Sequence, residues 1–129
     1  MENIKIEASD RSPEVDFDFD KNVYALRGES YPEDVTAFFG PVIGKLEERL
    51  GSLKGTEVQF DFELVYFNSS SAKVLMGLFD MLDETAAEGN AVVINWIYDE
   101  EDDNMEELGE EFAEDLENVQ FVMKKMAPS

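Results

Sequence analysis

The sequence lacks both cysteine and histidine throughout its 129 residues. Without cysteine the chain has no disulfide, no thiolate metal site and no thiol nucleophile. Without histidine it also lacks the commonest general base and the commonest ligand of transition metals. No glycine-rich phosphate loop of known pattern is present either. These absences make an enzyme the weakest interpretation of the sequence.

Basic residues are also scarce in this chain. There are 10 Lys and Arg residues against 31 Asp and Glu residues, so the formal net charge is −21. Such a charge repels nucleic acid and anionic membrane, and we expect neither as a partner. No apolar run approaches transmembrane length, and the first residues do not resemble a signal peptide. We therefore expect a cytoplasmic protein whose charge keeps it in solution or meets a basic partner surface.

Apolar residues are abundant enough for a folded core. They make up 43% of the chain and include 10 phenylalanines, which indicates a folded protein despite the charge. The length suits one domain that spans residues 1–129. Apolar alternation and apolar runs predict strands over residues 3–7, 14–20, 23–26, 58–67, 91–98 and 120–123. Helical spacing predicts three helices, over residues 33–50, 72–87 and 105–116, and residues 124–129 resemble a tail.

Local signals add detail to these elements. Ser30 and Glu33 have the spacing of a capping box, which predicts that the first helix starts there. Pro41 falls inside that helix and should kink it or split it in two. Both rows of residues 58–67 are apolar towards the end, so we expect that end of the strand to be buried on both faces. The apolar run over residues 91–98 is typical of a central strand covered on both faces.

A strand pattern changes abruptly into a helix pattern at residues 68–73, Asn-Ser-Ser-Ser-Ala-Lys. In α/β folds such a junction lies at the carboxyl end of the sheet, where ligands and modifications are usually found. The first turn of a helix offers free N–H groups and a partial positive charge, which suit a phosphate. The simpler interpretation is that one of the three serines only caps the helix. Both interpretations fit these residues.

The helix over residues 72–87 carries more apolar side chains than a single buried face needs. One stripe consists of Ala72, Leu75, Phe79, Leu82 and Ala86. Four more apolar residues lie outside that stripe: Val74, Met76, Leu78 and Met81. The surplus indicates either a second face that binds a partner protein, for which methionine is well suited, or a helix buried deeply in a small core.

An acidic segment runs from Asp99 to Glu117. Its carboxylates offer the oxygen ligands that magnesium and calcium prefer, but no spacing in it matches a defined metal loop. The segment is also suited to a basic partner by electrostatic complementarity. An acidic metal-binding or partner-mimicking protein that acts through this segment is the alternative function, although we assign no metal ligands.

Four stretches of the sequence carry a resemblance to a known family. They are residues 66–73 (Tyr-Phe-Asn-Ser-Ser-Ser-Ala-Lys), 11–17 (Arg-Ser-Pro-Glu-Val-Asp-Phe), 28–35 (Gly-Glu-Ser-Tyr-Pro-Glu-Asp-Val) and 96–103 (Trp-Ile-Tyr-Asp-Glu-Glu-Asp-Asp). Together they resemble the SiaC-type regulatory phosphoproteins, a bacterial family with a STAS-like fold. The resemblance implies a single α/β domain with a mixed β-sheet and helices packed mainly on one side.

The same resemblance implies a phosphorylation-switched signalling adaptor. In that family the unphosphorylated protein binds and activates a diguanylate cyclase, which raises cyclic-di-GMP and favours biofilm formation and aggregation. A cognate serine/threonine kinase phosphorylates the residue after the junction asparagine, here Ser69, and a PP2C-type phosphatase reverses this. The family often has threonine there, and Ser70 and Ser71 are the fallback sites. The resemblance implies neither catalytic activity nor a cofactor.

We expect the partner to bind the junction together with the exposed side of the helix that follows it. The expected surface comprises Asn68, Ser69, Ser70, Ser71, Lys73, Val74, Met76, Gly77 and Met81. In the free protein the helix dipole and Lys73 would tolerate a phosphate on Ser69. At a closely packed interface the same phosphate would be desolvated, so binding should weaken sharply.

Overall fold

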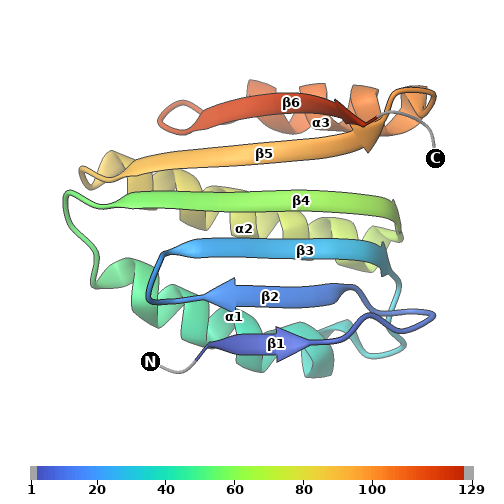
Figure 1. The fold of residues 1–129 in the computed structure, drawn as a ribbon, viewed down its shortest axis with the longest axis horizontal. Coiled ribbons are helices and arrows are strands. Elements are labelled where there is room, and N and C mark those ends of the chain that lie inside the picture. The colour runs from blue at the N-terminus through green and yellow to red at the C-terminus, as the bar shows by residue number, and fades with distance from the viewer. Residues whose placement is uncertain (1–2, 127–129) are drawn as a thin grey trace.

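The computed structural model of the protein describes residues 3–126, which form one six-stranded sheet and three helices (Figure 1). The strands are β1 (Ile4–Ile6), β2 (Glu14–Asp18), β3 (Val23–Ser30), β4 (Glu57–Phe67), β5 (Ala91–Asp99) and β6 (Gln120–Met126). The helices are α1 (Val35–Gly51), α2 (Ser69–Ala87) and α3 (Asp103–Glu114). None of the helices in this part of the chain is both long and apolar enough to cross a membrane.

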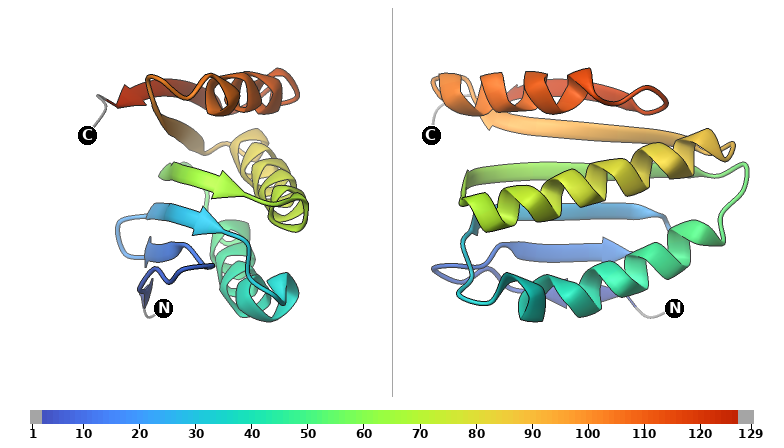
Figure 2. Two further views of the ribbon diagram at one scale, coloured as in Figure 1. Left: turned by 90° about the vertical axis from the view of Figure 1, so that its right-hand side faces the viewer. Right: turned by 180° about the vertical axis from the view of Figure 1, so that it is seen from behind.

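The strands follow one another across the sheet in chain order, β1 to β6. The first three strands pair antiparallel, whereas β3, β4, β5 and β6 pair parallel and are joined by α1, α2 and α3. Right-handed crossovers that all step in the same direction place their helices on the same face of the sheet. Helices α1, α2 and α3 lie together on one face of the sheet, and the other face is open (Figure 2). This arrangement confirms the predicted α/β fold with a mixed sheet and helices on one side.

The core lies between the helices and the helix-facing side of the sheet. Phe60 and Phe62 of β4 stack with ring centroids 4.4 Å apart, and Phe79 of α2 packs on Phe62 at 4.9 Å. Trp96 of β5 is 2% exposed and donates its Nε1–H to the carbonyl of Met105 at 2.9 Å. Full burial of each such aromatic ring contributes about 1.5–3 kcal/mol, so this cluster fixes α2 and α3 on the sheet.

The first helix differs from its prediction both at the expected capping box and at the proline inside it. Asp34, not Ser30, is the N-cap, and its side chain accepts a hydrogen bond from the N–H of Ala37. Ser30 is the last residue of β3, so the capping-box prediction was wrong. The helix also continues through Pro41 without a split. The carbonyl of Ala37, which loses its helical donor at this proline, belongs to an exposed residue and is open to water.

The end of β4 is not buried on both faces. Gly28 of β3 pairs with Leu64, and the next residue of β3 pairs with Tyr66, so Val65 is the extra residue of a bulge. Gly28 has a φ of 109°, which favours glycine and permits the shift. Val65 is therefore 65% exposed and Tyr66 50% exposed, while Phe67 turns inward onto Trp96.

Strand β5 and the end of the chain also differ from their predictions. Helices cover only one face of β5 (Figure 2), because the other face belongs to the open side of the sheet. There Asn95 donates a hydrogen bond to the Asp61 carboxylate at 2.7 Å. The predicted tail at residues 124–129 is a strand as far as Met126, since β6 pairs with β5 along that length. Residues 127–129 lie outside the part that the structure describes.

One testable consequence concerns Tyr24, whose phenol is buried in the core. Burial raises its pKa from 10.0 to about 12. The folded protein therefore keeps this proton where the unfolded chain loses it, so the contribution to stability is full below pH 10 and is lost as pH rises towards about 12. We expect Tyr24→Phe to flatten the fall in stability over that pH range. Urea unfolding of both proteins at several pH values checks this, and equal falls would contradict it.

Candidate functional site

The junction between β4 and α2 is organised by Asn68. Its Oδ1 accepts a hydrogen bond from the N–H of Ser71 at 2.9 Å, with the backbone of Asn68 extended, so Asn68 is the N-cap of α2. Its own N–H donates to the carbonyl of Ser30 at the end of β3, at 3.1 Å. Asparagine is among the strongest N-cap residues because its short amide reaches the free N–H groups of the first turn. The interpretation that one of the serines caps the helix was therefore wrong.

The three serines after the cap have different environments. Ser69 and Ser70 are exposed in the first turn of α2. Ser71 is 1% exposed, and its Oγ accepts a hydrogen bond from the Oγ of Ser30 at 2.8 Å. A phosphate on Ser71 would lie in the core and break this hydroxyl pair, and no partner reaches it there. The structure thus removes Ser71 from both the fallback sites and the expected binding surface, and leaves Ser69 and Ser70 accessible.

Three of the six remaining residues of the expected surface are exposed. Lys73, Met76 and Gly77 are exposed, whereas Asn68, Val74 and Met81 are half-buried. Ser69, Lys73 and Met76 follow at steps of four and three residues, so they lie on one exposed stripe of α2. Met76 is 52% exposed, which is unusual for a large apolar side chain. Leu78, which lies outside the main apolar stripe, is 1% exposed and belongs to the core, as the alternative of a deeply buried helix predicts for this residue.

The electrostatic surroundings of Ser69 suit a phosphate. The first turn of α2 contains no acidic residue, although the chain as a whole has a net charge of −21. Lys73 lies one turn after Ser69, and the first carboxylate along α2 belongs to Asp80. The free N–H groups and dipole at a helix N-terminus attract an anion, as does a lysine one turn away.

Exposed aromatic and apolar side chains lie beside the junction, near the carboxyl ends of β3 and β4. The sequence patterns predicted none of them to be exposed there. Tyr66 packs edge-on against Tyr31, with ring centroids 5.7 Å apart. The exposed Val65 is next to Tyr66, and the backbone N–H of Tyr31 donates to the carbonyl of Arg11 at 2.7 Å. The bulge that exposes Val65 and Tyr66 is a property of the pairing between two strands. A strand pattern read along one segment therefore gives no sign of it.

The Asn68 cap gives a second testable consequence. We expect Asn68→Ala to lower the free energy of unfolding by about 1 kcal/mol, because the N–H of Ser71 loses its acceptor at a partly buried position. Ser70→Ala is the matched control, since the exposed Ser70 hydroxyl makes no hydrogen bond within residues 3–126. Urea unfolding of the two variants measures the difference. Equal stabilities would show that the amide does not cap the helix.

The beginning of the acidic segment has structural roles. The side chain of Asp102 caps α3 by accepting the N–H of Met105 at 3.1 Å, and Asp99 accepts the N–H of Glu101 at 2.9 Å. Tyr98 donates a hydrogen bond to Glu106 at 2.8 Å, and this bond raises the pKa of Tyr98 to about 12. Within residues 3–126 no three acidic side chains converge as ligands of one metal ion would. The alternative of a metal-binding protein therefore has no geometric support.

Comparison with known proteins identifies the family. The family described as SiaC family regulatory phosphoprotein matches residues 6–126 of this chain. The chain belongs to the SiaC family. An uncharacterized protein of Pseudomonas aeruginosa strain UCBPP-PA14 is 33% identical over 115 residues, which cover 89% of this chain and 90% of that protein.

Solved structures of SiaC proteins have the same fold. The crystal structure of apo-SiaC from Pseudomonas aeruginosa has a TM-score of 0.87 and 32% sequence identity, covering 96% of this chain and 99% of that one. A second crystal structure, of the diguanylate cyclase SiaD in complex with its activator SiaC from the same organism, contains a chain with a TM-score of 0.89. That chain is 31% identical, and the match covers 95% of the present chain and 99% of the other.

Proposed function

We propose that the protein is a signalling adaptor that binds and activates a diguanylate cyclase in its unphosphorylated form. The observation that carries this proposal is the likeness to the SiaC chain that is the activator in the complex with SiaD, at a TM-score of 0.89 over 95% of this chain. Membership of a family of regulatory phosphoproteins supports the same role. The resulting cyclic-di-GMP would favour biofilm formation and aggregation.

The proposed switch is the reversible phosphorylation of Ser69. A cognate serine/threonine kinase adds the phosphate and a PP2C-type phosphatase removes it, in the cytoplasm, where ATP and GTP are both available. Exposure of the hydroxyl, the acid-free first turn and Lys73 support Ser69 as the acceptor. Ser70 is equally accessible and is the fallback. The chain itself contributes no catalytic step in this proposal.

The proposed docking surface is the stripe of Ser69, Lys73 and Met76, extended by Ser70. All four residues are exposed. Burial of Met76 by a partner would remove a largely exposed apolar side chain from water, which favours binding. A phosphate on Ser69 would stand at the start of this stripe and obstruct it.

The test is an assay of the host's diguanylate cyclase, with GTP as substrate and cyclic-di-GMP as the measured product. Addition of the unphosphorylated protein should increase the rate, and Met76→Glu should lower both binding and activation by about tenfold, because a buried carboxylate lacks a partner. Val23→Glu is the matched control, because Val23 is 37% exposed at the opposite end of the sheet. No activation by the wild-type protein would refute the function. Equal effects of the two substitutions would refute the surface.

A further inference from the structure

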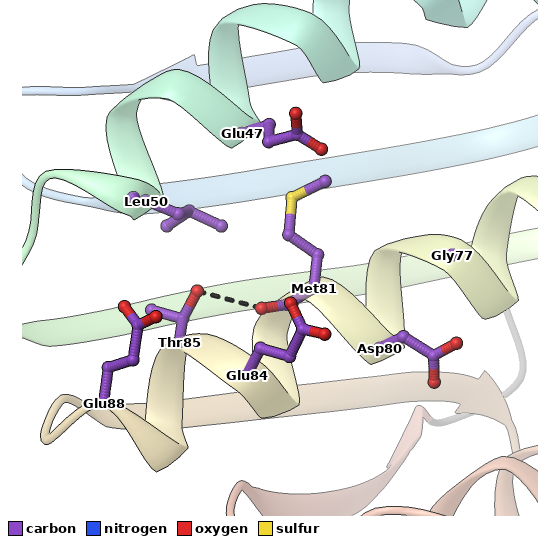
Figure 3. A pocket seen from close by; sticks show the side chains of 9 residues that line it. Glu47, Leu50, Gly77, Asp80, Met81, Glu84, Thr85 and Glu88 are labelled. Carbon is purple, nitrogen blue, oxygen red and sulfur yellow. Dashed lines mark hydrogen bonds between the residues drawn. The ribbon is translucent and has the colours of Figure 1, made fainter.

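A second candidate surface lies between the carboxyl-terminal halves of α1 and α2, away from Ser69. A hollow of about 420 Å³ lies between these two helices, and Figure 3 shows the side chains that line it. Leu50 and Thr85 lie in it with 1% and 4% exposure, and the half-buried Met81 extends towards α1. Glu84 follows Ser69 by 15 residues of helix, or about 22 Å at the rise of an α-helix. This surface is therefore separate from the phosphorylation site.

Four carboxylates surround the hollow, those of Glu47, Asp80, Glu84 and Glu88. All four side chains are exposed, and no basic residue of the part of the chain that the structure describes lines the hollow. The ion pairs found within residues 3–126 lie elsewhere, at Arg11 and Arg27. No side-chain donor of that part of the chain reaches these carboxylates either, so the four residues line the hollow with unpaired acceptors.

The acids on α2 are unfavourable for the helix that carries them. Asp80, Glu84 and Glu88 recur every four residues, a spacing at which like charges repel on a helix. The last turn of α2 contains no basic residue, so Glu84 and Glu88 also oppose the negative end of the helix dipole. Local conflicts of this kind are expected where a surface has a function.

Charge alone does not distinguish this surface, because α3 carries acids at the same spacing. Glu107 and Glu111 are exposed on α3, but neither lines a hollow with buried apolar residues beneath it. The surface between α1 and α2 combines unpaired carboxylates with the apolar Leu50 and Met81. This combination is complementary to a partner surface on which apolar residues are flanked by basic residues.

We propose that the hollow between α1 and α2 is a docking groove for a basic amphipathic helix of a partner protein. A groove between two packed helices accommodates a third helix, whose apolar face covers the half-buried Met81 above the core residue Leu50. Lysine or arginine residues on both flanks of that helix pair with Glu47 on one side and with Asp80 and Glu84 on the other. The proposal does not depend on the phosphorylation switch, because the groove begins along α2 at Gly77, about two helical turns after Ser69.

The probe for this groove is a synthetic amphipathic peptide of about 18 residues, with leucine along one face and lysine along both flanks. A peptide of the same composition in scrambled order is its reference. Calorimetry at about 0.15 M salt measures the affinities, because exposed charges more than about 8 Å apart are then largely screened. Amide shifts in NMR spectra locate the bound peptide. We expect the amphipathic peptide to bind more tightly than the scrambled one and to shift Gly51, Gly77 and Glu84 most.

Two double variants with the same change in net charge distinguish the contribution of the groove to peptide binding from that of the overall charge. Asp80→Asn combined with Glu84→Gln should weaken binding of the amphipathic peptide by about tenfold, through the loss of two ion pairs. Glu107→Gln combined with Glu111→Gln removes the same charge from α3 and should weaken it by less than about twofold. Equal weakening by the two pairs, the largest NMR shifts on α3, or equal affinity of the scrambled peptide would each overturn the proposal.

A third variant tests the shape of the groove. A Cβ added at Gly77 would have no other atom within 4 Å. The side chain of Gly77→Tyr therefore starts in open space and brings an aromatic ring to the groove that Gly77 lines. It should weaken binding about tenfold, through obstruction of the apolar contacts. Ala37→Tyr on the exposed side of α1 is its control and should have no effect. Ser69→Asp should also bind the peptide as the wild-type protein does. A loss caused by Ser69→Asp or Ala37→Tyr, or none caused by Gly77→Tyr, would contradict the proposed groove.

Discussion

Phosphorylation of Ser69 is expected to weaken binding of the protein to its diguanylate cyclase by about a hundredfold or more. The modification adds a charge of about −1.5 to −2 and three strong acceptor oxygens to the first turn of α2. In the free protein Ser69 is exposed, so water, the helix N-terminus and Lys73 stabilise that charge. In the complex the phosphate would lose its water without gaining an equivalent set of donors, and this cost appears directly as lost affinity.

Calorimetry with the purified cyclase measures this effect on the unmodified and the phosphorylated protein. Ser69→Ala should bind as the unmodified protein does and should resist the kinase, whereas Ser69→Asp should give a smaller loss, because aspartate carries less charge than phosphate. Ser70→Ala is the matched control and should still be inactivated by the kinase, since Ser69 remains exposed. Unchanged affinity after stoichiometric phosphorylation of Ser69 would rule out the switch. Loss of phosphorylation in Ser70→Ala would move the site to Ser70.

The substitution Gly109→Ala is expected to destabilise the protein by about 3 kcal/mol, the upper end of the cost of overpacking. A Cβ at this position of α3 would lie 2.5 Å from Cδ1 and 2.6 Å from Nε1 of Trp96, and 2.9 Å from the methyl of Met123. The indole cannot move away easily, because its Nε1–H is bonded to the carbonyl of Met105 within the core. Helix α3 must therefore separate from β5 and β6 to accept one methyl group.

Gly77→Ala and Gly44→Ala are the controls for this prediction. Neither position has an atom within 4 Å of an added Cβ, and both lie inside helices. Each should stabilise the protein by about 0.5–1 kcal/mol, since alanine restricts the unfolded chain and favours the helix. Urea unfolding compares the three variants. If Gly109→Ala proved as stable as the controls, the close packing of α3 on Trp96 would be incorrect.

The sequence was sufficient to predict the elements whose patterns depend on one buried face. Alternation in β2 places Val15 and Phe17 inside and Asp16 and Asp18 towards solvent, as the structure has them. The junction at residues 68–73 was found because a strand pattern changes there directly into a helix pattern. These patterns are local, so they can be recognised in one segment without knowledge of the elements that pack against it.

The errors, and the choice that the sequence left open for Leu78, arise where a second element decides the outcome. Leu78 is buried because α2 packs on β5 and beside α1, which widens its covered face beyond one stripe. Val65 is exposed because the register between β3 and β4 shifts there. Ser71 is buried because β3 supplies Ser30 as its hydrogen-bond partner from 41 residues away. In each of these three cases, the sequence of the affected segment contains no pattern that indicates the contact with the other element.

The candidate site was therefore predicted in its location more accurately than in its members. Ser69, Lys73 and Met76 depend only on helix periodicity and the position of the junction, and all three are exposed. Tyr66 was expected to be buried, although it stands at half exposure beside the junction. The groove between α1 and α2 could not be predicted, because it requires the relative position of two helices separated by β4.

The strand order of the sheet has a consequence for how the chain is made. Each strand pairs only with the strands before and after it in the sequence, so every new strand that leaves the ribosome finds its neighbour already in place. Each parallel pairing spans a single strand–helix–strand crossover, so no strand pairing has to close a longer loop than that. The amino-terminal half, from β1 to α1, can thus serve as the template on which the later units are added in turn. Figure 1 shows the result: the first strand, β1, and the last strand, β6, form opposite edges of the sheet, and the strands between them follow the order in which they are made.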